Sequence, residues 1–236
     1  MKQILSYLLI VAITQSAIAD IHVEPLPNGL NGTGTTTRYW DCCKPSCAWD
    51  GNLNETYATV PVRSCSADGD TTIGDNEMSG CAENGTAFMC NDQQPLELNE
   101  TVTLGFVAAS FTAGADVSKC CTCLVLSFKD QIVGKQMIVQ VTNTGSDLNK
   151  NHFDIAMPGG GVGIFNGCSS QWNSPVDGWG DRYGGVHSIE ECANLPSQLQ
   201  PGCKWRFQWF GGADNPAVDF YEIKCPKELI KISNCQ

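Results

Sequence analysis

The stretch TTTRYWDCCKPSCAW, residues 35–49, decides how this chain is interpreted. Asp41 lies in it with aromatic residues on either side, directly before the paired cysteines Cys42 and Cys43. Once oxidised, these cysteines would hold the backbone of Asp41 in place. A carboxyl group held against aromatic surface is desolvated, which raises its pKa as a general acid requires, whereas one in contact with water stays ionised as a base.

A second segment, GSDLNKNHFD at residues 145–154, contributes further acidic residues. Asp154 follows Phe153 and precedes the glycine run at residues 159–161. Two carboxyl groups on opposite sides of a glycosidic bond are the usual equipment for sugar hydrolysis, so Asp41 and Asp154 form a candidate pair. The alternative is that each is an ordinary solvated acid among many.

Other kinds of chemistry lack their motifs. The sequence has three histidines, no Gly-x-Ser-x-Gly, no phosphate-binding loop, no dinucleotide fingerprint and no His-Glu-x-x-His. We therefore expect no cofactor and no metal. The 25 acidic residues outnumber the 14 basic ones, giving a net charge of −11, which argues against nucleic acid as a partner because phosphate binding relies on clustered cations. An uncharged partner fits better.

The first 19 residues predict secretion. A short basic start precedes a mostly apolar run at residues 4–13, and Ala17-Ile18-Ala19 has the small-x-small form of a signal-peptidase site. The alternative is an uncleaved N-terminal anchor, but the apolar run is too short to span a bilayer and no later stretch is long enough. We expect residues 1–19 to be a signal peptide and the protein to be extracellular, with no membrane partner.

Export makes disulfides the default interpretation of the 14 cysteines, which can form seven pairs. The clusters Cys42-Cys43 and Cys120-Cys121-x-Cys123 would suggest zinc thiolates only in a reducing compartment. Four Asn-x-Thr sequons predict a glycoprotein with surface sites at Asn31, Asn54, Asn84 and Asn99.

Alternating apolar residues predict several strands separated by glycine-rich turns, and therefore an all-β barrel or sandwich. The alternation covers residues 103–111, 124–128, 137–142, 205–209 and 218–223. Helices should be few and short: Ser188-x-x-Glu191 has the capping-box pattern of a brief helix towards Leu195.

A single domain is expected over residues 35–236. The cysteines run from Cys42 to Cys235 and tie this part together, and no repeat or long linker interrupts it. The proline and glycine residues of segment 20–34 predict a short flexible lead-in. We expect a monomer.

Residues 36–47 resemble the N-terminal signature of glycoside hydrolase family 45, which comprises small secreted endoglucanases, and the resemblance extends over about residues 34–235. It implies a mainly β fold: a six-stranded double-psi β-barrel with long disulfide-linked loops, a few short helices and an open cleft. The other motifs that carry it are Gly80-Cys81, Gly105-Phe106, Cys120-Cys121-x-Cys123, Asn151-His152-Phe153-Asp154, residues 158–165, Arg182-Tyr183-Gly184-Gly185, Pro201-Gly202-Cys203-x-Trp205-Arg206-Phe207 and Ala213-Asp214-Asn215-Pro216.

The resemblance implies roles for three acids. Asp41 corresponds to the catalytic base, Asp154 to the catalytic acid and Asp147 to a third cleft aspartate that assists the acid or stabilises the transition state. The family inverts the anomeric centre, so the two catalytic carboxyl groups should lie about 6.5–9.5 Å apart to admit a water.

The implied substrate is a β-1,4-glucan, whose flat sugar faces suit aromatic platforms. Trp172 and Trp179 lie either in the cleft or in the core, whereas Trp205, Phe207 and Trp209 are expected in the core. The implied substrate-binding residues are Tyr39 and Trp49, as platforms, with Thr37, Lys44, His152 and Tyr183 near them.

The resemblance also implies a disulfide connectivity that the sequence alone leaves open. It would fasten the loop of Asp41 to the barrel at three points. The implied pairs are Cys42–Cys168, Cys43–Cys81, Cys47–Cys120, Cys65–Cys90, Cys121–Cys235, Cys123–Cys225 and Cys192–Cys203.

Two departures from the family pattern affect the substrate. Asn166 stands where an acid is expected, and segment 172–181 is longer and differently composed than usual; such a loop could favour a branched glucan such as xyloglucan. Rival interpretations are a non-hydrolytic expansin-like protein that binds polysaccharide, which would lack an equivalent of Asp41, and a barwin-like defence or lectin module, which would lack the paired aspartates.

Overall fold

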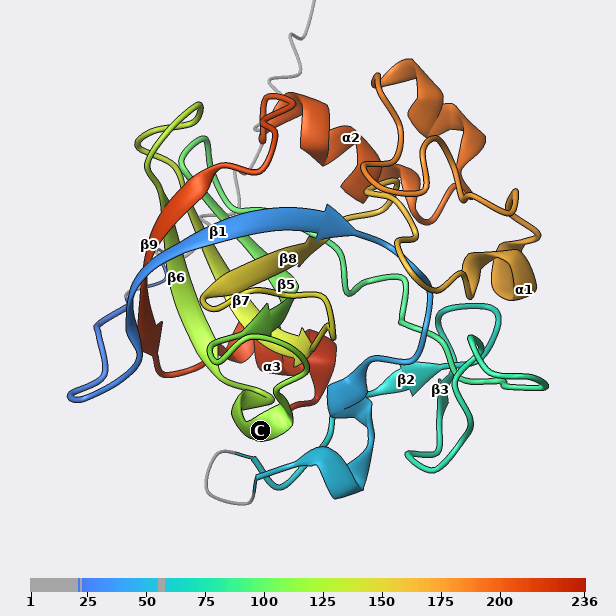
Figure 1. The fold of residues 1–236 in the computed structure, drawn as a ribbon, viewed down its shortest axis with the longest axis horizontal. Coiled ribbons are helices and arrows are strands. Elements are labelled where there is room, and N and C mark those ends of the chain that lie inside the picture. The colour runs from blue at the N-terminus through green and yellow to red at the C-terminus, as the bar shows by residue number, and fades with distance from the viewer. Residues whose placement is uncertain (1–20, 22, 55–57) are drawn as a thin grey trace, which may run out of the picture.

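The computed structural model describes residues 21, 23–54 and 58–236; the predicted signal peptide, residues 1–19, lies outside them. The main sheet has the strand order β4-β5-β7-β6-β9-β1-β8, and a further pairing of β5 with β8 closes six strands into a barrel. In Figure 1, β1 arches across the barrel in front of β8. The barrel strands are β1 (Asn31–Tyr39), β5 (Val102–Ser110), β6 (Cys123–Phe128), β7 (Gln136–Asn143), β8 (His152–Ala156) and β9 (Ala217–Ile223), and β4 (Leu96–Glu97) pairs with the outer side of β5. The expected mainly β barrel is confirmed.

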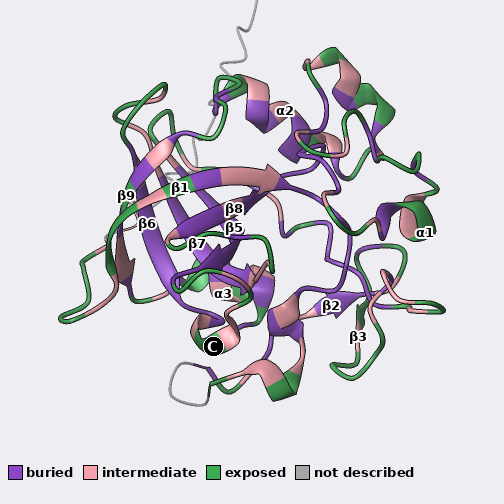
Figure 2. Ribbon diagram, viewed as in Figure 1, coloured by how far each residue is buried: buried purple, intermediate pink, exposed green. Residues whose placement is uncertain are grey.

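Strand alternation sorts the apolar side chains into two clusters. One cluster takes side chains from β5, β6, β7, β8 and β9 and fills the barrel. It includes Leu124, Leu126 and Phe128 of β6, whereas Val125 of the same strand belongs to the second cluster, beneath the loops and helices. Successive side chains of a strand point to opposite faces, and β5, β6, β7 and β8 are buried on both of them, whereas β1 and β9 carry exposed residues. Figure 2 shows this burial along the strands, with exposure concentrated in the loops.

The register of β1 brings two segments of the candidate site together. β1 runs parallel to β8, and Thr37 pairs with Asp154 in that ladder. On its other side β8 is antiparallel to β5, where Ala108 pairs with Asp154. Asp154 is therefore anchored by ladders on both sides.

The long loops outside the barrel contain the short α-helices α1, α2 and α3 and a small second sheet formed by β2 and β3 (Figure 1). The α-helices are α1 (Cys168–Trp172), α2 (Gln200–Gln208) and α3 (Lys227–Ser233), and the second sheet pairs β2 (Ser64–Cys65) with β3 (Thr72–Ile73). The 3-10 helices are η1 (Ser46–Ala48), η2 (Asp50–Asn52), η3 (Val117–Lys119) and η4 (Glu190–Asn194).

The strand predicted at residues 205–209 is wrong, because this segment belongs to α2 and its C-terminal cap. Pro201 lies at the start of the helix, where a missing backbone N–H costs nothing. Trp205 and Trp209 are one helical turn apart and stack with ring centroids 5.3 Å apart. The aromatic alternation therefore reflected a helical i, i+4 pair, although both side chains are in the core as expected.

The lead-in is ordered further towards the N-terminus than expected. β1 begins at Asn31 and pairs with β9, and Pro25 forms an isolated bridge with Ile223. The expectation of a flexible segment up to residue 34 is therefore wrong from Pro25 onward. The predicted brief helix after Ser188 is the 3-10 helix η4; Ser188 does not cap it, and the Glu191 carboxylate instead accepts the N–H of His187 at 2.8 Å.

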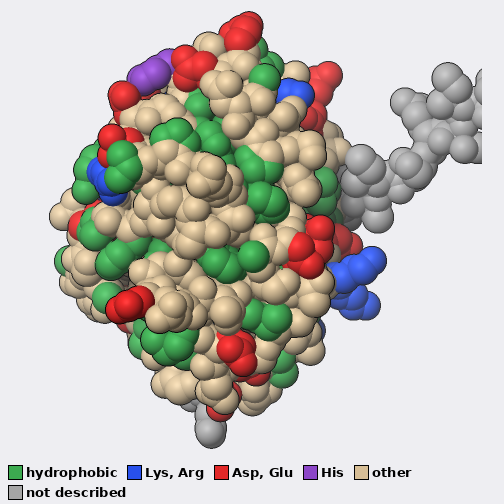
Figure 3. Space-filling model, turned by 90° about the vertical axis from the view of Figure 1, so that its right-hand side faces the viewer, with side chains coloured by type: hydrophobic (Ala, Val, Ile, Leu, Met, Phe, Trp, Pro, Cys, Tyr) green, Lys and Arg blue, Asp and Glu red, His purple; other side chains and the backbone are tan. Residues whose placement is uncertain are grey.

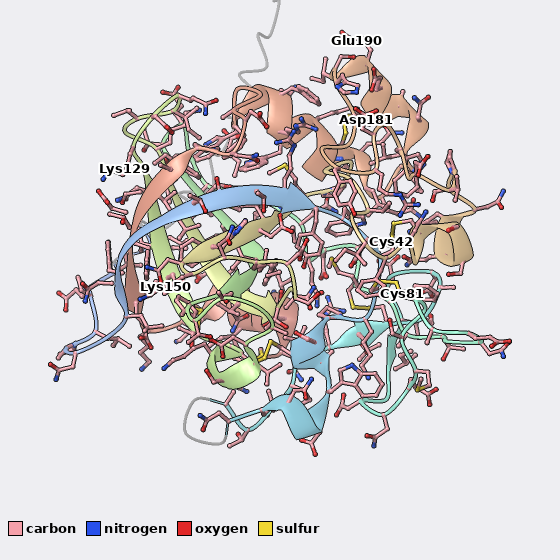
Figure 4. The ribbon with its side chains drawn as sticks, viewed as in Figure 1. Cys42, Cys81, Lys129, Lys150, Asp181 and Glu190 are labelled. Carbon is pink, nitrogen blue, oxygen red and sulfur yellow. A yellow bond between two sulfur atoms is a disulfide. The ribbon has the colours of Figure 1, made fainter. Side chains whose placement is uncertain are left out.

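Seven disulfides involve all 14 cysteines, and their pairs are those that the family resemblance implied. Figure 4 labels Cys42 and Cys81 on the side of the molecule where the chain leaves β1 for the outer loops. Crosslinks of this density are typical of proteins that fold in an oxidising compartment. Within the described part of the chain, no helix is long and apolar enough to cross a membrane.

Replacing Phe153 by Ala should lower the free energy of unfolding by about 3–5 kcal/mol, because its side chain is fully buried in the barrel. Its ring makes edge-on contacts with Phe111 and Phe220, at centroid distances of 5.8 and 5.0 Å. Urea denaturation with the disulfides intact measures the change. Phe165→Ala is the control: this side chain is 58% exposed and should cost about 0.5 kcal/mol or less. Equal costs for both would contradict the assigned core.

Candidate active site

Two hollows of about 400 and 390 Å³ contain the two candidate carboxyl groups. We name them the Asp154 hollow and the Asp41 hollow. The Asp154 hollow is lined by residues 37–39, 147–148, 152, 154, 163, 182–184 and 214–215. The Asp41 hollow is lined by residues 41, 43–44, 46, 49, 52, 79, 81–82, 143–144 and 165.

Tyr39 connects the two hollows. The residue lines the Asp154 hollow although it is only 6% exposed, and its hydroxyl accepts a hydrogen bond at 3.2 Å from the amide of Asn143, which lines the Asp41 hollow. Burial raises the pKa of Tyr39 well above its ordinary value, and the charges of Asp41 and Asp154 raise it further. The phenol therefore stays neutral between the two acids.

Asp41 is held by its own backbone surroundings. Its Oδ1 accepts the N–H of Cys43 at 2.9 Å, and its carbonyl oxygen accepts the N–H of Gly167 at 2.8 Å. Cys42 adopts a left-handed conformation with φ of 62°, and the bridges Cys42–Cys168 and Cys43–Cys81 fix both residues that follow the acid. Burial raises the pKa of Asp41 to about 6, although the Cys43 hydrogen bond opposes the shift.

Asp154 has the higher pKa of the two acids, about 7. Burial is the main cause, and the negative charges of Asp147 and Asp41 add to it, because each disfavours a further charge nearby. A hydrogen bond from the Thr37 hydroxyl opposes the shift. Asp147 itself is exposed and lines the same hollow.

A chain of hydrogen bonds orients Asp154. The N–H of Asn149 donates to Nδ1 of His152 at 3.3 Å, so the ring carries its proton on Nε2. That nitrogen lies 2.8 Å from the Thr37 hydroxyl oxygen, and the hydroxyl donates to Oδ1 of Asp154 at 2.6 Å. Burial lowers the pKa of His152, which keeps the ring neutral. Thr37 and His152 therefore position the acid.

Lys44 lines the Asp41 hollow and also makes contacts within the protein. Its ammonium donates to the carbonyl oxygens of Asp75 and Glu77 at 2.5 and 3.0 Å, and it lies 3.5 Å from the centroid of the Trp49 ring. The residue is only 5% exposed. Two of its three N–H donors are therefore engaged with protein, and the ammonium lies against Trp49, which lines the same hollow.

The remaining implied aromatic residues divide between cleft and core. Tyr183 is 68% exposed and lines the Asp154 hollow. Trp179 is buried in the second apolar cluster and Trp172 packs against that cluster, so both belong to the core alternative. Among the described residues, no group of three or more His, Cys, Asp or Glu could hold a metal ion.

Sequence reasoning missed two polar groups in these hollows. Asn143 accepts the N–H of Ser46 at 2.8 Å besides bonding Tyr39. Its only signal was a polar residue at the end of an alternating strand. Arg38 binds the Asp214 carboxylate at 2.6 Å and the carbonyl of Gly184 at 3.1 Å, thereby joining three segments that line the Asp154 hollow. Asp214 was noted only as part of a motif.

Comparison of the sequence with known proteins identifies one family. Residues 33–236 match the family model described as Glycosyl hydrolase family 45. The chain belongs to this family. The "Endoglucanase" of Cryptopygus antarcticus is 53% identical over 215 residues, which is 90% of this chain and 93% of the relative. The "Endoglucanase" of Phaedon cochleariae is 49% identical over 218 residues, covering 92% and 89%.

A solved structure confirms the fold. The crystal structure of the cellulase from the Antarctic springtail Cryptopygus antarcticus superposes with a TM-score of 0.82 at 54% identity, covering 87% of this chain and 97% of that one. This family 45 chain thus shares its barrel with a cellulase.

Replacing Asp147 by Asn should lower the pKa of Asp154, because the variant removes a negative charge that raises it. Carboxyl ¹³C NMR titration measures the change directly. Asp219→Asn is the control, since Asp219 is exposed on β9 and pairs with Lys129. An unchanged or higher pKa at Asp154 in the Asp147 variant would show that the two groups do not interact as described.

Proposed function

We propose that this chain is a secreted endo-β-1,4-glucanase that hydrolyses internal bonds of cellulose or a related β-1,4-glucan with inversion. The observation that carries the proposal is the pair of desolvated carboxyl groups, one in each hollow, with the higher pKa at Asp154. Family membership and the names of its relatives support the same reaction.

The two pKa values support one assignment of the roles. Between about pH 6 and about pH 7, Asp41 is mostly ionised while Asp154 is mostly protonated. An inverting hydrolase needs one carboxylate to take a proton from water and one carboxylic acid to supply a proton. Asp41 is therefore the base and Asp154 the acid, with Asp147 helping to keep the acid protonated.

The proposed reaction is a single displacement at the anomeric carbon. Asp41 takes a proton from a water molecule, whose oxygen forms a bond to the anomeric carbon. The bond from that carbon to the glycosidic oxygen breaks, and the oxygen leaves with the proton of Asp154. Asp41 ends protonated and Asp154 ionised, and exchange with solvent restores both. This geometry requires a separation of about 6.5–9.5 Å between the two carboxyl groups.

The neighbouring residues hold the polymer and the acid. Trp49 and Tyr183 offer aromatic surface in the two hollows, which suits the apolar faces of successive sugars. Thr37 and His152 fix the orientation of Asp154 through hydrogen bonds. Tyr39 lies between the two hollows, so we place the scissile bond near this residue.

Two other functions have specific support. The extended loop at 172–181 favours a xyloglucan-preferring hydrolase, which would use the same three acids. The shared barrel favours an expansin-like polysaccharide binder, but the buried Asp41 with its raised pKa fits hydrolysis better. We further propose that the protein is an extracellular monomer; the asparagines of all four sequons are exposed and stay predicted glycosylation sites.

Asp41→Asn and Asp154→Asn should each lower kcat on carboxymethyl cellulose at least about 100-fold, because each removes a proton-transfer group at constant shape. The same assay on xyloglucan gives the substrate preference. Asp219→Asn is the matched control and should retain wild-type activity. If either catalytic variant stays active, its assigned role is wrong; if the wild type hydrolyses neither glucan, the proposed function is wrong.

The product released first should have the α configuration, because single displacement inverts a β-linked anomeric centre. ¹H NMR of cellohexaose cleavage, recorded before mutarotation, distinguishes the anomers. A β-configured first product would rule out inversion while leaving hydrolysis intact.

A further inference from the structure

Large hydrophobic side chains gather on two loop segments beside the hollows. Of the eight large hydrophobic residues that are exposed in the described part of the chain, half lie on residues 163–166 and 175–183. Their exposed fractions are 49% for Ile164, 58% for Phe165, 73% for Val176 and 68% for Tyr183. We name these four residues the apolar rim. Exposed apolar groups that cluster in this way mark interaction sites.

The apolar rim is held rigid by side chains beneath it. The amide of Asn166 donates to the carbonyl oxygens of Pro175 and Val176 at 3.1 and 3.0 Å. Arg182 also donates to the Val176 carbonyl, at 2.9 Å, and to the carbonyl of Gly163, at 3.1 Å. A backbone hydrogen bond from Gly163 to Arg182 completes the link. The two segments therefore form one braced surface.

Asn166 has a part in this brace that an acid could not take. The expected family residue at this position is a carboxylate, which has no N–H to donate and would repel two carbonyl oxygens. The asparagine departure and the unusual loop at 172–181 are therefore one feature: the amide holds the loop against residues 163–166.

The charges near the apolar rim are paired with each other. Asp177 binds Nε of Arg182 at 2.9 Å, so Val176 is flanked by a closed ion pair. Figure 3 shows the side of the molecule that carries α1, where hydrophobic side chains are scattered over the middle and few basic ones are present. A surface with few basic groups suits an uncharged polymer better than an anionic partner.

The apolar rim extends the hollows outward. Phe165 lines the Asp41 hollow and Tyr183 lines the Asp154 hollow, whereas Ile164 and Val176 line neither. A single glucan chain in the hollows would therefore contact Phe165 and Tyr183. Ile164 and Val176 could contact only a ligand that is wider than one chain. An insoluble glucan presents such a surface, because neighbouring chains expose adjacent flat sugar faces.

We propose that the apolar rim, braced by Asn166 and Arg182, docks the protein on the flat sugar faces of insoluble β-1,4-glucan beside the chain being cut. The inference rests on the proposed glucanase function. It makes Ile164 and Val176 docking residues for the insoluble polymer and Asn166 a positioning residue.

The double variant Ile164→Ser/Val176→Ser tests docking. Its partition onto microcrystalline cellulose should weaken roughly tenfold, the scale expected when two aliphatic side chains are no longer removed from water. Its kcat/KM on soluble cellopentaose should equal that of the wild type. Val133→Ser is the matched control, because Val133 is 72% exposed in the turn between β6 and β7, remote from the rim.

The outcomes separate this inference from the proposed function. If the wild type cleaves cellopentaose but the double variant binds cellulose as well as the wild type, docking by the rim is wrong and hydrolysis stands. If cellopentaose is not cleaved, the proposed function fails by itself. Sedimentation that shows a wild-type dimer dispersed by the double variant would also overturn the proposal, because the rim would then bind a second copy.

Asn166→Asp tests the brace. Amide hydrogen exchange at residues 176–178 should become faster, and cellulose partition should weaken in the same direction as in the double variant. Unchanged exchange would remove the assigned role of Asn166. Faster exchange with unchanged partition would show that the braced conformation has no part in docking.

Discussion

Desolvation of two carboxyl groups that still face open hollows is the constraint on which the site depends. Burial raises the pKa values of Asp41 and Asp154, and full solvation would return both to ordinary acids. Each acid is held in its buried position by the backbone around it. Two disulfides and a backbone N–H fix Asp41, and two strand ladders fix Asp154. The charge of Asp147 then separates the pair further.

Much of the fold followed from the sequence, because the apolar residues at 124–128 and 137–142 mark strands, although the structure buries both faces of these strands rather than one. The disulfide pairs followed only from family resemblance, since spacing does not define connectivity. The helix at Gln200–Gln208 was missed because tryptophans at 205 and 209 fit both a period of two and one helical turn. Pro201 was the signal that could have decided between them.

The site was predictable in its acids and less so in their supports. Asp147 and Asp154 line one hollow and Asp41 lines the other, and their catalytic roles stay predictions. The family resemblance placed Lys44 near the substrate, and the structure adds that its ammonium binds two carbonyl oxygens while the residue lines the Asp41 hollow. Asn143 and Arg38 were missed because their partners lie far away in the sequence, at Tyr39 and Asp214, and only folding brings them together.

The pairing of β1 with β8 has a consequence for how the protein tolerates change. Thr37 lies opposite Asp154 in a ladder that also closes the barrel. Slippage by a single position would set Arg38 or Thr36 opposite that acid and turn every β1 side chain to the other face. A guanidinium there would hold the carboxyl group in its charged form, unable to give up a proton. The same strand register therefore determines both barrel closure and the surroundings of Asp154. Insertions or deletions within β1 should be selected against more strictly than those in the surrounding loops.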